Sequence, residues 1–187
     1  MIKKIINPFR YLPLRQALCW GIVVMILTAI FEWQCGLRAT TLTQIDFGGG
    51  RLWNTTLRQV LIWVAYSVVL YIGGVLFSKS KVRFSDVAAF NLFARIPFDL
   101  SLLIFAIPSV KSIMGYATDG NLNAMMEHIT PLTIIGAISS LFAVWYFFWT
   151  YKAFAEATNL KNGKGVAVFF SCFLITYIGS YYILRLV

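Results

Sequence analysis

The stretch from Phe84 to Pro108 is the feature that most constrains what this chain can fold into. It is apolar and long enough to cross a bilayer as a helix, because about 20 such residues span the hydrocarbon core. Two charged side chains, Arg95 and Asp99, nevertheless lie near its middle. A charge at membrane depth costs at least about 2.5 kcal/mol, so it normally faces protein or water instead of lipid. We therefore expect this stretch at the centre of a helical bundle.

A polar stripe runs along this expected span. Residues four apart share one face of a helix, so Arg95 and Asp99 can pair, and Asn91 lies one turn earlier on the same face. Pro97 stands between the two charges, has no N–H, and disrupts the helical hydrogen bond to the carbonyl of Phe93. The spacing predicts a kinked helix. The role of the stripe stays open between a structural ion pair, a contact with a partner and a transport site.

The rest of the chain repeats the pattern of long apolar segments. Of its 187 residues, 59% are hydrophobic and 12% are charged, whereas about 25% are charged in a typical soluble protein. The pattern predicts five spans, at about 16–34, 57–77, 84–108, 131–155 and 165–184. We expect an all-α, polytopic integral membrane protein, with residues 1–187 forming one five-transmembrane-helix bundle.

The basic residues predict the topology of this bundle. A net charge of +9 in a soluble protein would suggest nucleic acid, but Lys and Arg in a membrane protein concentrate on the cytoplasmic side. An N-terminus in the cytoplasm puts ten of the 16 basic residues on that side and five on the other. We therefore expect the N-terminus inside, the C-terminus outside and no nucleic-acid partner. The basic segment 1–15 is expected to contact lipid headgroups, through Lys3, Lys4, Arg10 and Arg15.

The segments between the spans carry weaker signals. Glu32 is expected at a membrane edge, and Gly48–Gly50 at the tip of a flexible loop. Asn54–Thr56 is expected to cap the second span, because such side chains satisfy the free N–H groups of a helix start. In the loop at about 109–130, a short interfacial helix is expected around Asn121–Ile129.

Two stripes of small residues mark faces suited to close helix packing, because small side chains let helix backbones approach each other. The fourth span carries Gly136, Ser140 and Ala143, and the fifth carries Cys172, Thr176 and Gly179. We expect these faces, or the aromatic residues at 145–151, to hold a partner.

Catalysis is not expected from this sequence. It contains neither HExxH nor GxSxG. Acid–base catalysis by carboxylates needs two of them, and the expected neighbour of Asp99 is Arg95. One histidine and three scattered cysteines form no metal-binding spacing. The chain is therefore expected to be no enzyme and to have no catalytic residue, metal site or cofactor.

Two segments resemble a known family. GGVLFSKSKVRFSDVAAFNLFARIPFDL (73–100) and WYFFWTYKAFAEATNLKNGKGVAVFFSCFL (145–174) are similar to the second-to-third and fourth-to-fifth span regions of prokaryotic Yip-domain proteins, relatives of the Ypt/Rab-interacting membrane proteins. The resemblance implies a five-helix bundle with a mostly non-enzymatic role in membrane organisation and partner binding. The DLYGP-like signature of the eukaryotic members is absent, which favours the bacterial cytoplasmic (inner) membrane.

Together these features predict a non-catalytic integral membrane scaffold or accessory subunit. Its expected partners are membrane lipids and another membrane protein, or a second copy of the chain. The alternative is a small, oligomeric transporter or channel with a polar path near Arg95 and Asp99, because intramembrane ionisable groups often mark such paths.

Overall fold

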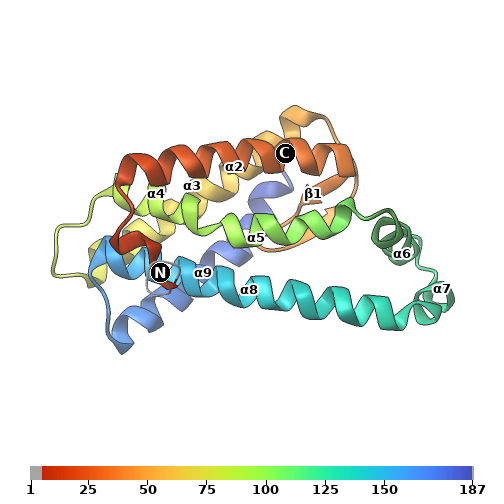
Figure 1. Ribbon diagram of the computed structural model, residues 1–187. Helices are drawn as coiled ribbons and strands as arrows, with labels where there is room; N and C mark the ends of the chain where they lie inside the picture. The colour runs from red at the N-terminus through yellow and green to blue at the C-terminus, as the bar shows by residue number, and fades with distance from the viewer. Residues whose placement is uncertain (1–5, 187) are drawn as a thin grey trace.

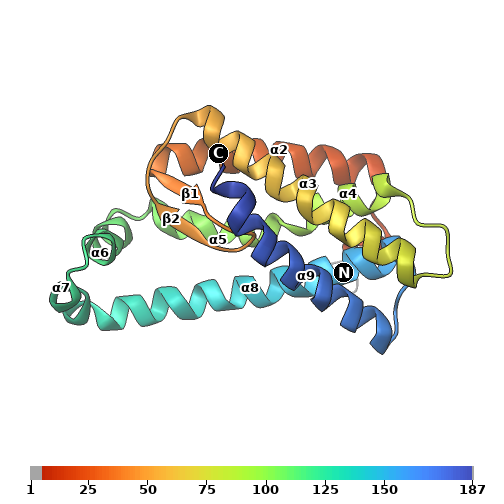
Figure 2. The same ribbon diagram turned by 180° about the vertical axis from the view of Figure 1, so that it is seen from behind.

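Five long apolar helices dominate the computed structural model, which describes residues 6–186, apart from the side chains at 117, 118 and 122. The all-α five-helix prediction is confirmed (Figures 1 and 2). Each of the five is long and apolar enough to cross a membrane, and the chain is an integral membrane protein on this ground. Four are continuous: α2 (Leu14–Cys35), α3 (Leu52–Phe77), α8 (Ile129–Thr158) and α9 (Gly163–Leu184).

The third span is broken and lies at the centre of the bundle. It consists of α4 (Phe84–Ala94), α5 (Ile96–Ser101) and the short 3-10 helix η2 (Leu102–Ala106). Pro97 lies in the first turn of α5, directly after the break. This span contacts α2, α3 and α8. Of its apolar stretch 61% is buried, against at most 33% in any other span, which makes it the bundle's central element.

The segment between α2 and α3 is more ordered than expected. Strands β1 (Leu37–Ala39) and β2 (Ile45–Phe47) form an antiparallel hairpin, in which Arg38 is paired with Asp46. Leu37, Ala39 and Leu42 are buried, so the hairpin packs its apolar side against the end of the bundle. Three-residue strands are too short to give a clear alternating pattern, which explains why the sequence predicted only a loop.

The start of α3 also differs from its prediction. The helix begins at Leu52, five residues before the predicted span, and the Arg51 side chain makes no capping bond. The hydroxyl groups of Thr55 and Thr56 instead donate to the carbonyl oxygens of Arg51 and Leu52. The predicted Asn54–Thr56 cap is therefore wrong, because these residues lie inside the first turns.

Two helices occupy the segment between η2 and α8, at one end of the molecule (Figure 1). The expected short helix is present as α7 (Leu122–Glu127), and α6 (Pro108–Thr118) was not predicted. The third span ends at Ala106 because Ile107 is extended, as is usual before a proline, and Pro108 then starts α6.

The N-terminal segment is packed into the bundle. The short 3-10 helix η1 (Pro8–Arg10) places Phe9, which is buried, between α4 and α8. Its ring centroid lies 5.6 Å from that of Phe90 and 6.0 Å from that of Trp149. The Asn7 amide donates to Glu156 at 3.0 Å. Arg10 and Arg15 are exposed, as headgroup contacts require, and Lys3 and Lys4 lie outside the described residues.

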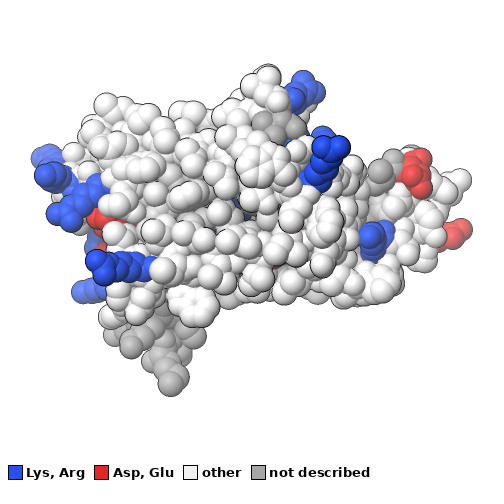
Figure 3. Space-filling view, turned by 90° about the horizontal axis from the view of Figure 1, so that it is seen from above, with Lys and Arg blue, Asp and Glu red and all other residues white. Residues whose placement is uncertain are grey.

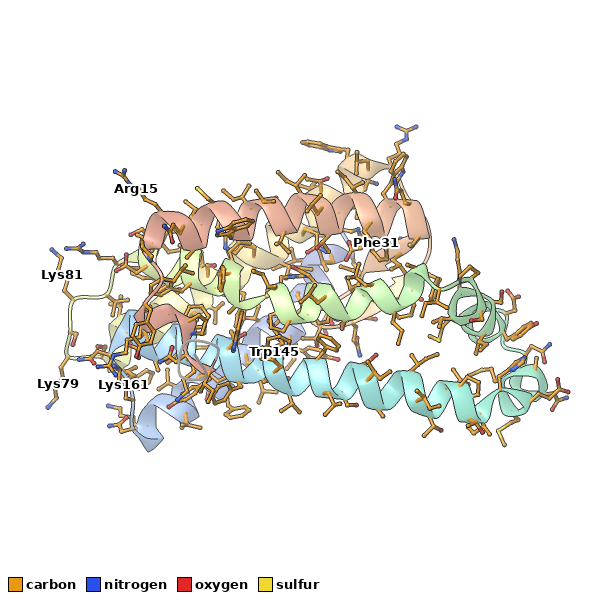
Figure 4. The ribbon with its side chains drawn as sticks, in the orientation of Figure 1. Arg15, Phe31, Lys79, Lys81, Trp145 and Lys161 are labelled. Atoms are coloured by element: carbon orange, nitrogen blue, oxygen red, sulfur yellow. The ribbon has the colours of Figure 1, made fainter. Side chains whose placement is uncertain are left out.

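Charged side chains gather towards the two ends of the molecule. On the face in Figure 3, Lys, Arg, Asp and Glu lie at either end of a broad uncharged belt. Figure 4 places Arg15, Lys79, Lys81 and Lys161 together at one end. An apolar belt between two charged ends is the surface expected of a protein surrounded by lipid.

Gly165 provides a test of how tightly α9 is joined to α8. A Cβ at this position would overlap the carbonyl oxygen of Leu160 and lie 2.8 Å from its carbonyl carbon. Backbone atoms cannot rotate away, so we expect Gly165→Ala to lower the free energy of unfolding by about 1–3 kcal/mol. Thermal unfolding in detergent would measure this change.

Gly163→Ala is the matched control. Gly163 begins the same helix, and a Cβ there would meet nothing within 4 Å. Its unfolding temperature should equal or exceed that of the wild type, since alanine favours helix by up to about 1 kcal/mol over glycine. Equal unfolding temperatures for the two variants would contradict the packing described here.

Candidate functional site

The break between α4 and α5 places a buried ion pair inside the bundle. Arg95 occupies the junction of the two helices, and Asp99 lies in α5, one turn further on. The Arg95 Nε donates to Oδ1 of Asp99 at 3.2 Å, and the two side chains are 7% and 5% exposed. The Arg95 guanidinium carbon also lies 5.3 Å from the centroid of the Phe98 ring. The two charges therefore neutralise each other within protein.

Asn91 makes a second polar contact in the same region. Its amide nitrogen donates to the hydroxyl oxygen of Ser67 in α3 at 3.0 Å, and both residues are buried. A hydrogen bond between two membrane helices fixes their relative rotation and height, because it needs both partners in register. All three residues of the predicted polar stripe are thus buried, and they make two separate contacts.

Glu32 is a buried group whose partner the sequence did not predict. It was expected at a membrane edge, and it lies in the last turn of α2. Its side chain is fully buried, and its Oε1 accepts a 2.6 Å hydrogen bond from the Gln59 amide in α3. The unpredicted hairpin packs against the end of α2, and the packing of α2 against α3 brings Gln59 beside Glu32. The charges of Arg95 and Asp99 also act on the Glu32 carboxyl, and the ion pairs among the described residues do not include Glu32.

Three polar atoms of this region are buried without a hydrogen-bond partner among the described residues. They are Oε2 of Glu32, one terminal guanidinium nitrogen of Arg95 and the hydroxyl of Tyr66. A cavity of about 10 Å³ lies beside two of them, lined in part by Tyr66, Asn91, Arg95 and Tyr146. That volume suits one water molecule, whereas small-molecule sites enclose about 300–1,000 Å³.

This arrangement is suited to holding helices together. The Glu32–Gln59 contact joins α2 to α3, the Asn91–Ser67 contact joins α4 to α3, and the Arg95–Asp99 pair neutralises the break in the central span. Within the described part of the chain, no group of three or more His, Cys, Asp or Glu residues is arranged to hold a metal ion. The residues brought together here can hydrogen-bond and neutralise charge across the bundle.

The two small-residue stripes have different surroundings. In α8, Gly136 and Ser140 are exposed and Ala143 is half-buried. In α9, Cys172 and Thr176 are buried, and the Cys172 thiol donates to the carbonyl oxygen of Val69 in α3. Gly179, the third member of the α9 stripe, is half-buried.

The expectation that the α9 stripe holds a partner is therefore wrong for Cys172 and Thr176. A Cβ on Gly73 of α3 would lie 2.5 Å from the Cys172 sulfur, so α3 approaches α9 closely at this point. The small side chains serve this internal contact, which a sequence cannot distinguish from an external one. Within the α8 stripe, Gly136 and Ser140 remain accessible.

The Arg95–Asp99 pair generates a stability prediction. Arg95→Ala leaves Asp99 buried without its partner, so we expect it to lower the free energy of unfolding by about 3–5 kcal/mol. Exchanging the charges, with Arg95→Asp and Asp99→Arg together, should restore part of that loss. Unfolding in mixed detergent, followed by circular dichroism, measures both variants against the wild type.

Lys111→Ala is a suitable control, because it removes a positive charge from an exposed position on α6. It should unfold like the wild type. If Arg95→Ala also unfolds like the wild type but loses a cellular activity, the pair is a functional site and not a structural one.

Comparisons with known proteins add no assignment to this site. The chain matches no protein-family model, no curated protein and no solved structure. The similarity to Yip-domain proteins stays an expectation, and what the protein does has to be inferred from the geometry of its own side chains.

Proposed function

We propose that the protein is a non-catalytic integral membrane scaffold or accessory subunit. Its partner is a transmembrane helix of another membrane protein or of a second copy of this chain, and lipid covers the rest of its apolar surface. The observation that carries this proposal is the exposure of the first half of α8, which bears the Gly136–Ser140 pair.

The first half of α8 packs little against the rest of the bundle. Only 11% of the apolar stretch of this span is buried, the lowest share among the five. In Figures 1 and 2 this half extends along one edge of the molecule towards α7. Its exposed residues occupy a wide arc of the helix, and include Thr133, Ile134, Gly136, Ala137, Ile138, Ser140 and Leu141.

Gly136 and Ser140 give this surface a specific shape. They are four residues apart and so lie on one face, and a Cβ on Gly136 would meet nothing within 4 Å. The Ser140 hydroxyl donates to the carbonyl oxygen of Gly136 at 2.8 Å, so this hydroxyl has its hydrogen-bond partner within its own helix. Two small residues in this spacing let a second helix backbone come close, and such contacts drive helix association in lipid.

The buried polar cluster supports a structural role over transport. Arg95 and Asp99 neutralise each other at 3.2 Å, and the cavity beside Arg95 has room for about one water molecule. A transport path through one copy needs a wider polar cavity. The transporter alternative thus requires several copies that enclose a polar axis.

The distribution of charge supports the proposed orientation. Arg15, Lys79, Lys81 and Lys161 lie at one end of the bundle in Figure 4, and basic residues concentrate on the cytoplasmic side of membrane proteins. We place this end, with the N-terminus, in the cytoplasm of a bacterial cell and the hairpin end outside. Membership of the Yip-domain family is part of the same proposal.

A double substitution on α8 tests the partner prediction. Gly136→Leu with Ser140→Leu should prevent close approach of a second helix, because leucine side chains hold the backbones apart. The native protein, extracted in polymer discs, is expected to carry a stoichiometric second chain that the double variant loses. Quantitative mass spectrometry and the mass of the eluted particle measure this loss.

Ala137→Leu is the control, because it adds a leucine to another part of the exposed arc. It should retain the second chain. Monomeric particles for all three proteins would contradict the scaffold proposal, and a ring of copies around Arg95 would favour the transporter.

Lysine-to-cysteine substitutions test the orientation. Lys79 and Lys111 are both exposed and lie on opposite sides of the third span. With Cys19 and Cys35 replaced by serine, Lys111→Cys should react with an impermeant maleimide in intact spheroplasts, and Lys79→Cys only after lysis. The reverse pattern would show that the topology is inverted.

A further inference from the structure

Three arginines surround two adjoining pockets at the hairpin end of the bundle. The larger pocket, about 430 Å³, is lined by Arg38 of β1, Arg58 of α3 and Arg185, which follows α9. The smaller, about 160 Å³, lies among Arg38, Arg58, Gly49 and Gly50. Both share Arg38 and Arg58, so the two pockets form one basic site, which we call the arginine site.

Arg58 is the most informative member of the arginine site. Its side chain is buried, with only 5% of the residue exposed, and one terminal nitrogen donates to the carbonyl oxygen of Ala39 at 3.1 Å. Its Nε is buried and has no hydrogen-bond partner among the described residues. A buried guanidinium with an unused donor is costly unless something satisfies it. Arg58 therefore carries one unsatisfied donor beside the two pockets that it lines.

Positive charge in the arginine site is not balanced by its acidic residues. The ion pairs in the described part of the chain are Arg95–Asp99 and Lys161–Glu156, and neither involves the arginine site. Arg38 and Arg58 repel each other electrostatically. The larger pocket is lined by three arginines and by one carboxylate, that of Asp46. The site carries an excess of positive charge that an anion would neutralise.

The start of α3 borders the smaller pocket of the arginine site. Gly48–Gly50 leads directly into this helix, and Asn54 and Thr55 of its first turns line the smaller pocket. Gly49 has a positive φ of 60°, a conformation that glycine adopts readily. The N–H groups of Asn54 and Thr55 already donate to the carbonyl oxygen of Arg51. The start of α3 therefore contributes the positive end of its helix dipole, which attracts anions.

We propose that the arginine site binds a phosphate group, held by Arg38, Arg58 and Arg185 at the start of α3. Arginine suits this ligand because its planar fork of donors matches phosphate oxygens. The phosphate belongs either to an anionic lipid headgroup or to a free phosphate compound. Trp53 and Tyr182 are 70% and 64% exposed, and such aromatic side chains concentrate at headgroup depth.

This site does not depend on the proposed scaffold function. It is built from the hairpin, α3 and the end of α9, and uses no residue of α8. Loss of a partner from α8 and loss of phosphate binding can therefore be observed separately.

The test uses the full chain in a maltoside detergent, which contains no phosphate. One arm titrates phosphatidylglycerol and counts bound lipids by native mass spectrometry. The other titrates inorganic phosphate and follows binding by calorimetry. The variant is Arg38→Gln with Arg185→Gln, because both side chains are exposed and their removal leaves the Arg58–Ala39 contact intact. We expect affinity to fall about tenfold for each arginine, which corresponds to ~1.4 kcal/mol.

Arg51→Gln with Lys111→Gln is the matched control. It removes two exposed positive charges from the same side of the bundle, and neither residue lines the two pockets. Binding of the lipid alone, weakened only by the first variant, identifies a headgroup site. Binding of inorganic phosphate with the same dependence identifies a free phosphate site. Equal affinity in both variants and the wild type, or no binding of either probe, overturns the proposal.

Discussion

The need to neutralise two charges inside an apolar bundle is the constraint on which the rest of this structure depends. Arg95 and Asp99 lie in the most buried span, where an unpaired charge would cost several kcal/mol. Their 3.2 Å contact offsets that cost, provided that both side chains are surrounded by protein and not by lipid. The third span is consequently held at the centre, with α2, α3 and α8 packed against it.

Helix α3 connects this centre to the rest of the bundle. Gln59 bonds Glu32 of α2, Ser67 bonds Asn91 of α4, and Gly73 allows the close approach of α9. Polar contacts are effective here because lipid supplies no hydrophobic force between apolar helices. Three contacts along one helix, each to a different neighbour, set the rotation and height of the spans together.

The surface divides into regions with different physical character. The first half of α8 is apolar, exposed and shaped by two small residues, which suits association within the membrane. The hairpin end is basic and hollowed and has one unused donor, Nε of Arg58, which suits a phosphate group at the membrane surface. A scaffold that holds a helix on one surface and a phosphate group on another would link protein and headgroup at a defined position.

The sequence by itself determined the five spans, the break near Pro97 and the pairing of Arg95 with Asp99, because helix length and four-residue spacing are local properties. Only the tertiary structure decided that Glu32 meets Gln59 and that Arg38, Arg58 and Arg185 converge. Those residues come from segments far apart in the chain, and their contacts depend on how α2, α3, α9 and the hairpin pack together. The tertiary structure also decided that Cys172 packs internally and that Gly136 stays exposed. Small residues look alike in sequence, and only packing distinguishes their surroundings.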